Sequence, residues 1–358
     1  MWKYFSVSTS TWGNKVELKA TAFTGSRALN MGRSGSMTLN VRDPKVAEAV
    51  SKTVLMPWER VLVAEWDGNA VYAGFITNVK ENLRQGTVDV THVDIWDLWK
   101  RRHILTLRGN GDQSAPPITW NNRTLATHAN LVVNRGMNGE PAGRYDLPLI
   151  MTADVVGTES RTYWGYKFQT VESALKEIME TEGGPDIDFD VRWSLGVEQL
   201  EWVMRSGNLT SGLWEWDATA TETEVYDLEL ETDATDMTNK LIGTGEGSER
   251  SLLVRDNSSF GGTAVALEKV ERYDYSDGNQ LQAHVNADLA ANDAYTQQLS
   301  FKIPVTGAVK VGQLILGGTC RLTTSGLYFF DAGQHDWRLI QYDFDHEWIT
   351  LHMQQIGG

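Results

Sequence analysis

The sequence has 358 residues, of which 41% are apolar and 22% are charged, a balance typical of a folded globular protein rather than a disordered one. Its 47 acidic and 32 basic residues give a net charge of −15, which argues against a protein that binds nucleic acid through the phosphates. The single cysteine, Cys320, excludes an intrachain disulfide, and no apolar run approaches the roughly 20 residues needed to cross a bilayer.

Residues 1–100 are predicted to form a first domain made mostly of strands. The run 36–41 alternates apolar and polar side chains, which is the period of a half-buried strand. Asp43 and Pro44 predict the start of a short helix that ends near Lys52, because Asp caps helices and Pro suits the first helical position. Three more strands are predicted, at 60–66, 71–79 and 87–93. Their tight turns favour an antiparallel meander, which we interpret as a small barrel.

The middle of the chain is predicted to hold two units. Residues 101–165 contain a Pro-Pro pair, a helical stretch and a segment rich in Gly and Pro, which together indicate an insertion or linker region. Residues 166–255 form a predicted α+β domain. In this domain Thr170 caps a helix that the Gly-Gly-Pro run 183–185 stops, and two strands follow.

Residues 256–358 return to a pattern of strands and are predicted to form a second β-barrel domain. Ser276 is the predicted cap of a helix over 279–292. Strands are predicted at 265–275, 298–305, 319–324, 337–344 and 347–353. The predicted fold class is therefore mainly β with an α+β insertion, in which two small β-barrel domains flank a middle α+β region.

Two triplets of predicted strands resemble each other. Both have the order strand, turn, strand, loop, strand, and apolar residues occupy corresponding positions in the two triplets. The first lies at 61–66, 74–79 and 87–92, and the second at 320–324, 337–342 and 348–353. A duplicated unit and a chance similarity between common hairpins are both open on this pattern alone. If the unit is duplicated, three copies of the chain would present six similar units around one axis.

Two motifs that could bind ions or phosphates are better explained as structural. Asp186, Asp188 and Asp190 alternate along a predicted strand and face one side, which suits an exposed strand face or a strand edge protected against pairing. Calcium instead needs six to eight oxygens from a curled loop. The glycine-rich run 243–248 lacks the Gly-Lys-Ser/Thr ending of a phosphate-binding loop, so it predicts a flexible turn.

Candidates for metal binding and catalysis are also interpreted as structural. The densest mixture of possible metal ligands matches no zinc spacing; it comprises His335, Asp343, Asp345 and His346. The best enzyme-like neighbourhood resembles the paired carboxylates of a glycosidase and comprises Glu198, Glu201, Glu215 and Asp217 among Trp193, Trp202, Trp214 and Trp216. An exposed strand packed on a β domain gives the same alternation. No catalytic, cofactor-binding or metal-ligating residue and no cofactor is therefore predicted.

Taken in order, several stretches resemble the central tail-hub proteins of tailed phages, often called minor tail proteins in phages of actinobacteria. The resemblance is weakest over 101–165, and it rests on the order of the motifs rather than on any one of them. The stretches that carry it are 35–41, 74–76, 94–99 (Asp-Ile-Trp-Asp-Leu-Trp), 182–189, 236–243, 337–340 and 348–351.

The resemblance implies a structural, non-enzymatic subunit of the virion tail tip. In that family the first and last domains form a trimeric ring that continues the tail channel, and the middle domains face outward. The implied partners are a distal tail protein, the tape-measure protein and downstream tip or receptor-binding proteins. DNA would meet the chain only in transit, and no membrane insertion is expected.

Two alternative functions stay open on the sequence: a hexameric distal tail ring protein, and a carbohydrate-binding or carbohydrate-cleaving tail protein. The chain ends at Gly358 without an appended hydrolase, which leaves a wall-degrading role unsupported. The N-terminus lacks a charged segment followed by an apolar core, so no signal peptide is predicted. We therefore expect synthesis and assembly in the host cytoplasm.

Overall fold

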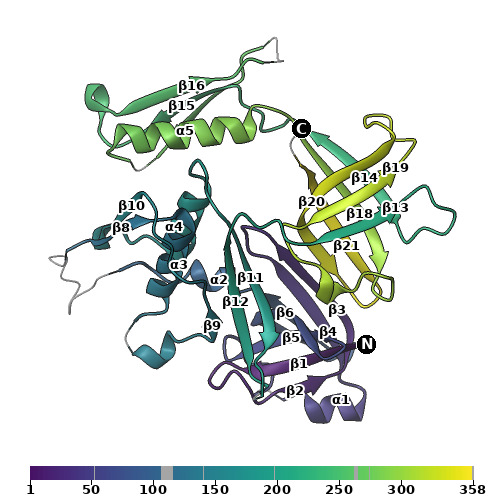
Figure 1. The fold of residues 1–358 in the computed structure, drawn as a ribbon. Coiled ribbons are helices and arrows are strands. Elements are labelled where there is room, and N and C mark those ends of the chain that lie inside the picture. The colour runs from purple at the N-terminus through teal and green to yellow at the C-terminus, as the bar shows by residue number, and fades with distance from the viewer. Residues whose placement is uncertain are drawn as a thin grey trace.

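The computed structural model describes residues 1–51, 53–105, 116–139, 141–196, 198–261, 265–273 and 275–356. The fold is mainly β, as the alternating runs predicted (Figure 1). Within the described residues the main sheet contains 13 strands, and three smaller sheets lie beside it. No described helix is long and apolar enough to span a membrane.

The first part of the main sheet comes from the N-terminal domain. Its strands pair in the order β3-β4-β7-β6-β5-β1-β2. Their bounds are β1 (Trp2–Ser8), β2 (Val16–Leu18), β3 (Ala20–Ala28), β4 (Ser34–Asn40), β5 (Arg60–Trp66), β6 (Asn69–Asn82) and β7 (Thr87–Val93). The short helix α1 (Pro44–Ala49) begins where the sequence predicted, and the Asp43 side chain accepts a hydrogen bond from the Lys45 backbone.

The second part of the main sheet comes from the C-terminal half of the chain. Its strands are β13 (Leu213–Asp217), β14 (Tyr226–Asp233), β18 (Thr296–Pro304), β19 (Thr319–Thr324), β20 (Gly333–Phe344) and β21 (Trp348–Gln355). β13 and β14 lie within the domain expected at 166–255, but they pair with β19 and β18, which lie within the domain expected at 256–358. Strand pairing therefore places these two strands with the C-terminal part of the chain. Composition cannot reveal such a grouping, because the paired strands are far apart in the sequence.

The two parts of the sheet join where β20 pairs with β3, as Figure 1 shows near the centre of the molecule. The path of paired strands runs from β14 to β2 without returning to its start. The two closed barrels expected at 1–100 and 256–358 are therefore not found among the described strands. Instead, both parts fold over one shared apolar core, to which Met37 and Ile76 contribute from the first part and Phe301 and Leu339 from the second.

The similarity between the two strand triplets extends to the topology of the sheet. The order β3-β4-β7-β6-β5 of the first part is repeated as β14-β18-β21-β20-β19 in the second. Each long strand carries an irregularity at the same place, between Ile76 and Asn78 in β6 and between Leu339 and Gln341 in β20. A chance likeness of hairpins would not reproduce the whole strand order together with the irregularity. We conclude that the two parts are two copies of one repeated unit.

The middle region packs helices against a β-hairpin. The elements are α2 (Trp96–Trp99), β8 (Ile118–Arg123), α3 (Leu125–Gly136), β9 (Leu149–Ile150), β10 (Glu159–Tyr163), α4 (Val171–Met179), β11 (Asp186–Trp193) and β12 (Leu200–Gly207), with short 3₁₀ helices η2 (Ala142–Arg144) and η3 (Gly165–Lys167). Thr170 caps α4 as predicted, because its side chain accepts from the Ser173 backbone. The core of this region also contains residues of β1, β5 and β6, so the middle region is anchored on the first part of the main sheet.

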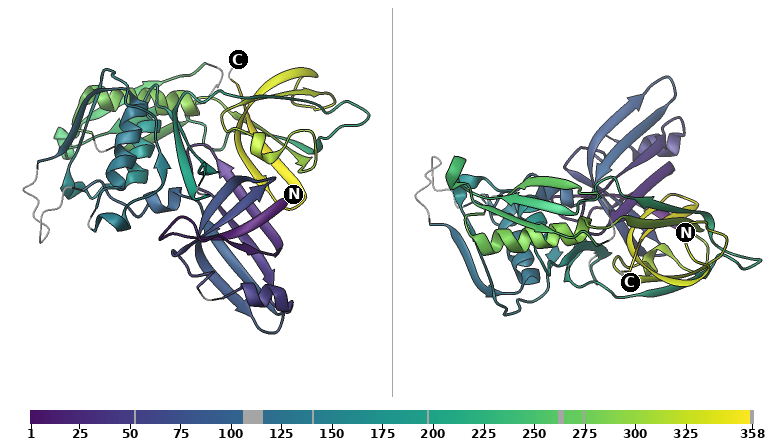
Figure 2. Two further views of the ribbon diagram at one scale, coloured as in Figure 1. Left: turned by 60° about the horizontal axis from the view of Figure 1, so that its bottom comes forward. Right: turned by 90° about the horizontal axis from the view of Figure 1, so that it is seen from above.

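A small α+β unit is inserted between β14 and β18 (Figure 2). It has its own apolar core around Leu281 and Val285. It contains β15 (Lys240–Thr244), β16 (Val254–Ser258), β17 (Glu268–Arg272), α5 (Gly278–Asn292) and the 3₁₀ helix η4 (Glu249–Ser251); η5 (Val311–Gln313) lies outside it. The predicted helix is present, but its cap is Asp277 and not Ser276. The Asp277 carboxylate accepts from two backbone N–H groups, those of Asn279 and Gln280.

His92 is a buried polar group at the centre of the first part of the sheet. Its ring is fully buried, stacks on Phe23 at 5.3 Å between ring centroids, and shares a 2.8 Å hydrogen bond with the Tyr72 hydroxyl. Glycines flank it on both neighbouring strands: a Cβ on Gly35 or Gly74 would lie 2.5 or 2.7 Å from the imidazole ring. Burial lowers the pKa of His92 from 6.5 to about 4, so the ring is neutral in the folded protein.

The depressed pKa of His92 predicts a loss of stability in acid. The contribution of neutral His92 to the free energy of unfolding is fully present above pH 6.5. It falls as the pH drops toward 4, because the histidine of the unfolded chain is protonated first. In His92→Gln, the fall in unfolding free energy between pH 7 and pH 4.5 should be smaller than in the wild type by about 2 kcal/mol. Urea titrations at the two pH values measure this difference, and equal acid sensitivity of the two proteins would contradict it.

Candidate functional site

The most distinctive polar site of the molecule lies where β11 meets both parts of the main sheet. Asp186, Asp188 and Asp190 share one face of β11, as the strand period predicted. The prediction that this face is exposed is wrong, because Asp188 is only 2% exposed. Each aspartate is bound by an arginine side chain, from Arg27 on β3, Arg205 on β12 or Arg338 on β20.

Asp188 is the centre of this charged junction. Both of its carboxylate oxygens accept from Nη2 of Arg27 at 3.0 Å. Arg205 donates to the same carboxylate through Nη2 at 2.6 Å and through Nε at 3.1 Å. Arg27 also reaches Asp190 at 2.5 Å, and Arg338 binds Asp186. Hydrogen bonds in which both partners are charged are roughly twice as strong as hydrogen bonds between neutral groups.

Neighbouring charges in the junction keep Arg27 and Asp190 ionised. Burial alone would lower the pKa of Arg27, but the negative charges of Asp188 and Asp190 outweigh burial and raise that pKa well above its ordinary value. Burial alone would raise the pKa of Asp190, but the Arg27 charge and the Val191 N–H group lower it. Arg27 and Asp190 therefore stay charged over the ordinary pH range. The junction ties the middle region to both repeats of the sheet.

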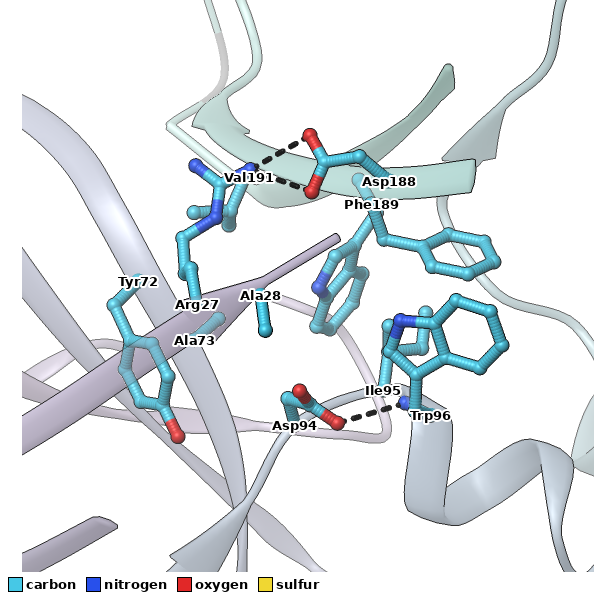
Figure 3. A pocket seen from close by; sticks show the side chains of 11 residues that line it. Arg27, Ala28, Tyr72, Ala73, Asp94, Ile95, Trp96, Asp188, Phe189 and Val191 are labelled. Carbon is cyan, nitrogen blue, oxygen red and sulfur yellow. Dashed lines mark hydrogen bonds and ion pairs between the residues drawn. The ribbon is translucent and has the colours of Figure 1, made fainter. Parts of the chain in front are cut away.

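A small cavity of about 20 Å³ lies against the junction, with room for about one water molecule. Figure 3 shows Arg27 and Asp188 at one end of it and Asp94 and Trp96 at the other. Burial raises the pKa of Asp94 to about 7, although the backbone N–H groups of Arg33 and Trp96 donate to its carboxylate. Sites for small organic ligands are usually at least 300 Å³, so this cavity fits no such ligand.

A second, open hollow of about 480 Å³ lies beside the N-terminus of α3. It is lined by Thr124–Ala126, by Gly183–Asp186 and by Gly207 and Asn208. Its one charged residue, Asp186, is already bound by Arg338 and by the Leu209 backbone. The hollow therefore presents no unpaired charge with which to hold a ligand.

The candidate metal ligands of the C-terminal region are not brought together. His335 bonds to the Asp331 carbonyl at 3.1 Å, and Asp343 binds His352 at 2.8 Å. Asp345 instead caps a turn by accepting from two backbone N–H groups, and His346 packs on Tyr4. In the described part of the chain, no group of three or more His, Cys, Asp or Glu side chains is placed to hold a metal ion.

The carboxylates of the enzyme-like neighbourhood are engaged in structural contacts. Glu215 forms an ion pair with Arg321 at 3.1 Å, and Asp217 accepts from the Thr219 backbone and hydroxyl. Glu198 pairs with Lys15 and Glu201 with Arg192. The tryptophans also separate: Trp193 and Trp202 belong to the core of the middle region, and Trp214 and Trp216 to the core of the main sheet. They do not line one groove.

The glycine-rich run 243–248 begins inside a strand rather than in a free turn. Gly243 is the fourth residue of β15, and a Cβ there would lie 2.3 Å from the Val285 side chain on α5. A Cβ on Gly245 would lie 2.4 Å from the Tyr275 carbonyl oxygen. These glycines permit close packing of the small unit, and no lysine follows them to bind a phosphate.

Sequence reasoning missed the three arginines of the junction. Arg27, Arg205 and Arg338 stand singly in strands, with no spacing that links them to one another or to β11. The alternation of aspartates in β11 was the one available signal, because three carboxylates on one strand face require counter-charges if that face is covered. Only the assembled sheets show that it is covered.

Comparisons with known proteins find similarity at the level of the fold. No protein-family model matches the sequence, and no curated protein matches it either. A tail protein from Neisseria meningitidis MC58 has a similar structure, with a TM-score of 0.62, 12% sequence identity, and coverage of 99% of this chain and 97% of the other. The 43 kDa tail protein of prophage MuSo2 from Shewanella oneidensis gives a TM-score of 0.59 and 9% identity, covering 98% of both chains.

A third solved structure is prophage tail protein gp18 from Listeria monocytogenes EGD-e. Its TM-score is 0.53 at 9% identity, and the match covers 98% of this chain and 94% of the other. All three matches extend over nearly the whole of this chain. The chain therefore has the fold of phage tail proteins, from the first strand of the main sheet to the last.

Proposed function

We propose that this chain is a structural hub subunit of a phage tail tip, forming a ring that continues the tail channel. The observation that carries the proposal is the repeated sheet unit within a fold shared with phage tail proteins over almost the whole chain. Two like units in one chain allow three chains to place six similar units around an axis, which lets a threefold ring meet a sixfold tube. The working form of the proposal is accordingly a homotrimer.

The proposed partners follow from a position at the end of the tail. A distal tail ring would lie above the hub, the tape-measure protein inside it, and tip or receptor-binding proteins below it. The chain acts by binding, without a reaction of its own, and it would sit at the tail tip of the virion after assembly in the host cytoplasm. Its net charge of −15 suits a channel through which DNA passes, since acidic walls do not retain phosphates.

The copy number and the position in the virion test this function. Native mass measurement of the purified protein should give three times the chain mass of 40.0 kDa. Six copies would instead favour a hexameric distal tail ring. In virions that carry an affinity tag on this chain, a gold label seen by electron microscopy should mark the tail tip. A monomer at micromolar concentration, or a label along the tail shaft, would contradict the proposal.

A further inference from the structure

Among the open strand edges of the main sheet in the described structure, two belong to β14 and to the end of β6. β14 pairs with β18 on one side and has no partner on the other. β6 pairs with β5 only as far as Phe75, so residues 77–82 have β7 on one edge and no strand on the other. Residues 78–81 are all exposed, and so is most of β14. Open edges present unpaired N–H and C=O groups that can pair with another strand.

The repeated unit shows which edges belong together. β6 occupies in the first repeat the place that β20 occupies in the second, and β14 has the place of β3. Within the chain, the end of β20 pairs antiparallel with β3, at the point where the two repeats meet. The equivalent contact at the other end of each chain joins the end of β6 to a β14 strand. Within one chain the end of β6 and β14 do not pair with each other in the described structure, so the partner strand would come from another copy.

The register of that contact follows from the strands already paired. The shared irregularity aligns Asn78 with Gln341, and therefore Lys80 with Asp343. Ser36 and Ser300 occupy equivalent positions in the two repeats. Thr24 lies opposite Ser36, and Glu229 lies opposite Ser300. Thr24 is therefore equivalent to Glu229, and Ser26, two residues further along, is equivalent to Glu231. Since Asp343 lies opposite Ser26 in the intrachain junction, Lys80 would lie opposite Glu231 of a neighbouring copy.

The charges of the two edges agree with this register. Lys80 and Glu231 are exposed, and no ion pair to either is found among the residues that the structure describes. Asp89, opposite Lys80 on β7, accepts instead from the Thr38 hydroxyl at 2.8 Å. In the same register the Asn78 amide faces Asp233. A row of carboxylates along β14 discourages pairing with most strands, while a lysine at the matching position favours this one.

We infer that residues 77–82 of β6 pair antiparallel with β14 of a second copy of this chain, with Lys80 opposite Glu231. This inference names the interface of the proposed ring and therefore rests on the proposed function. The contact is head-to-tail, so each copy uses one edge of each kind. A contact of that type closes into a ring when every copy is rotated by the same angle.

Disulfide trapping tests the pairing directly. Directly opposed residues of paired strands lie within the Cα–Cα range of a disulfide, so full-length protein carrying Lys80→Cys and Glu231→Cys should form covalent dimers and trimers on mild oxidation. The matched control, Asn82→Cys with Asp233→Cys, places both thiols on the same edges but out of register, and should stay uncrosslinked. The native Cys320 is buried and remains in both variants.

Charge reversal separates this inference from the proposed function. Lys80→Glu should weaken association about fivefold per contact, and the added Glu231→Lys change should restore it. A ring of normal mass that neither crosslinks nor responds to Lys80→Glu would overturn this pairing and leave the proposed function standing. A protein that stays monomeric would overturn both. Equal crosslinking of the in-register and out-of-register variants would also reject the pairing.

Discussion

Asp188→Ala is expected to lower the free energy of unfolding by about 3–5 kcal/mol. Asp188 is 2% exposed, and its carboxylate accepts hydrogen bonds from Arg27 and Arg205. Its removal leaves two guanidinium groups in a covered site, where Arg27 keeps its ion pair with Asp190 but Arg205 loses its carboxylate partner. A buried charge without its partner is costly because neither water nor a counter-ion solvates it. Urea unfolding followed by tryptophan fluorescence measures the loss.

Asp190→Ala is the matched control for that change. Asp190 lies on the same face of β11 and also binds Arg27, but its side chain is 48% exposed. Water can replace much of what it contributes, so the expected loss is about 1 kcal/mol or less. Similar losses for both variants would mean that the junction is not organised around Asp188.

Arg27→Ala combined with Asp188→Ala should lower the free energy of unfolding by less than the two single changes added together, because the pair acts as a unit.

Gly35→Ala is expected to destabilise the first repeat by about 3 kcal/mol or more. A Cβ at this position would lie 2.2 Å from the Thr24 carbonyl oxygen and 2.5 Å from Cε1 of His92. The carbonyl belongs to β3, which pairs with β4 on one edge and with β20 on the other. A backbone atom in the centre of a sheet cannot move aside without breaking those ladders. The change should therefore loosen the contact between the two repeats as well.

Gly143→Ala provides the control for Gly35→Ala. No atom lies within 4 Å of a Cβ placed on Gly143, and its backbone does not adopt the left-handed region. The free energy of unfolding of this variant, measured by urea titration, should stay within about 0.5 kcal/mol of the wild-type value. If Gly35→Ala were equally mild, the close approach of β3 and β4 would not be the constraint that the geometry indicates.

Much of the local structure could be predicted because it depends on neighbours in the sequence. Asp43 and Thr170 cap helices where the pattern placed them, and the alternating runs became strands. The cap of α5 was displaced by one residue, since Asp277 competes with Ser276 and the carboxylate satisfies two N–H groups. Short-range chemistry decides these features, so a single sequence contains the information.

The candidate site could not be predicted to the same degree. Three carboxylates on one strand face were visible in the sequence, but their counter-charges come from strands that are remote along the chain. The environment of the carboxylates in the enzyme-like neighbourhood could not be predicted for the same reason. Glu215, for example, forms its ion pair with Arg321, which lies on the neighbouring parallel strand and far along the chain. Whether a charged side chain is exposed or paired depends on what packs over it.

By itself, the sequence determined that the chain is mainly β, that an α+β part interrupts it, and that two strand triplets share a pattern. These properties follow from hydrophobic period and turn chemistry, which act over a few residues. Only the tertiary structure decided that the two repeats form one open sheet instead of two barrels, and that Asp188 is buried. Pairing between remote strands decides both, because hydrogen bonds between edges and the cover over a face depend on contacts that no local pattern encodes.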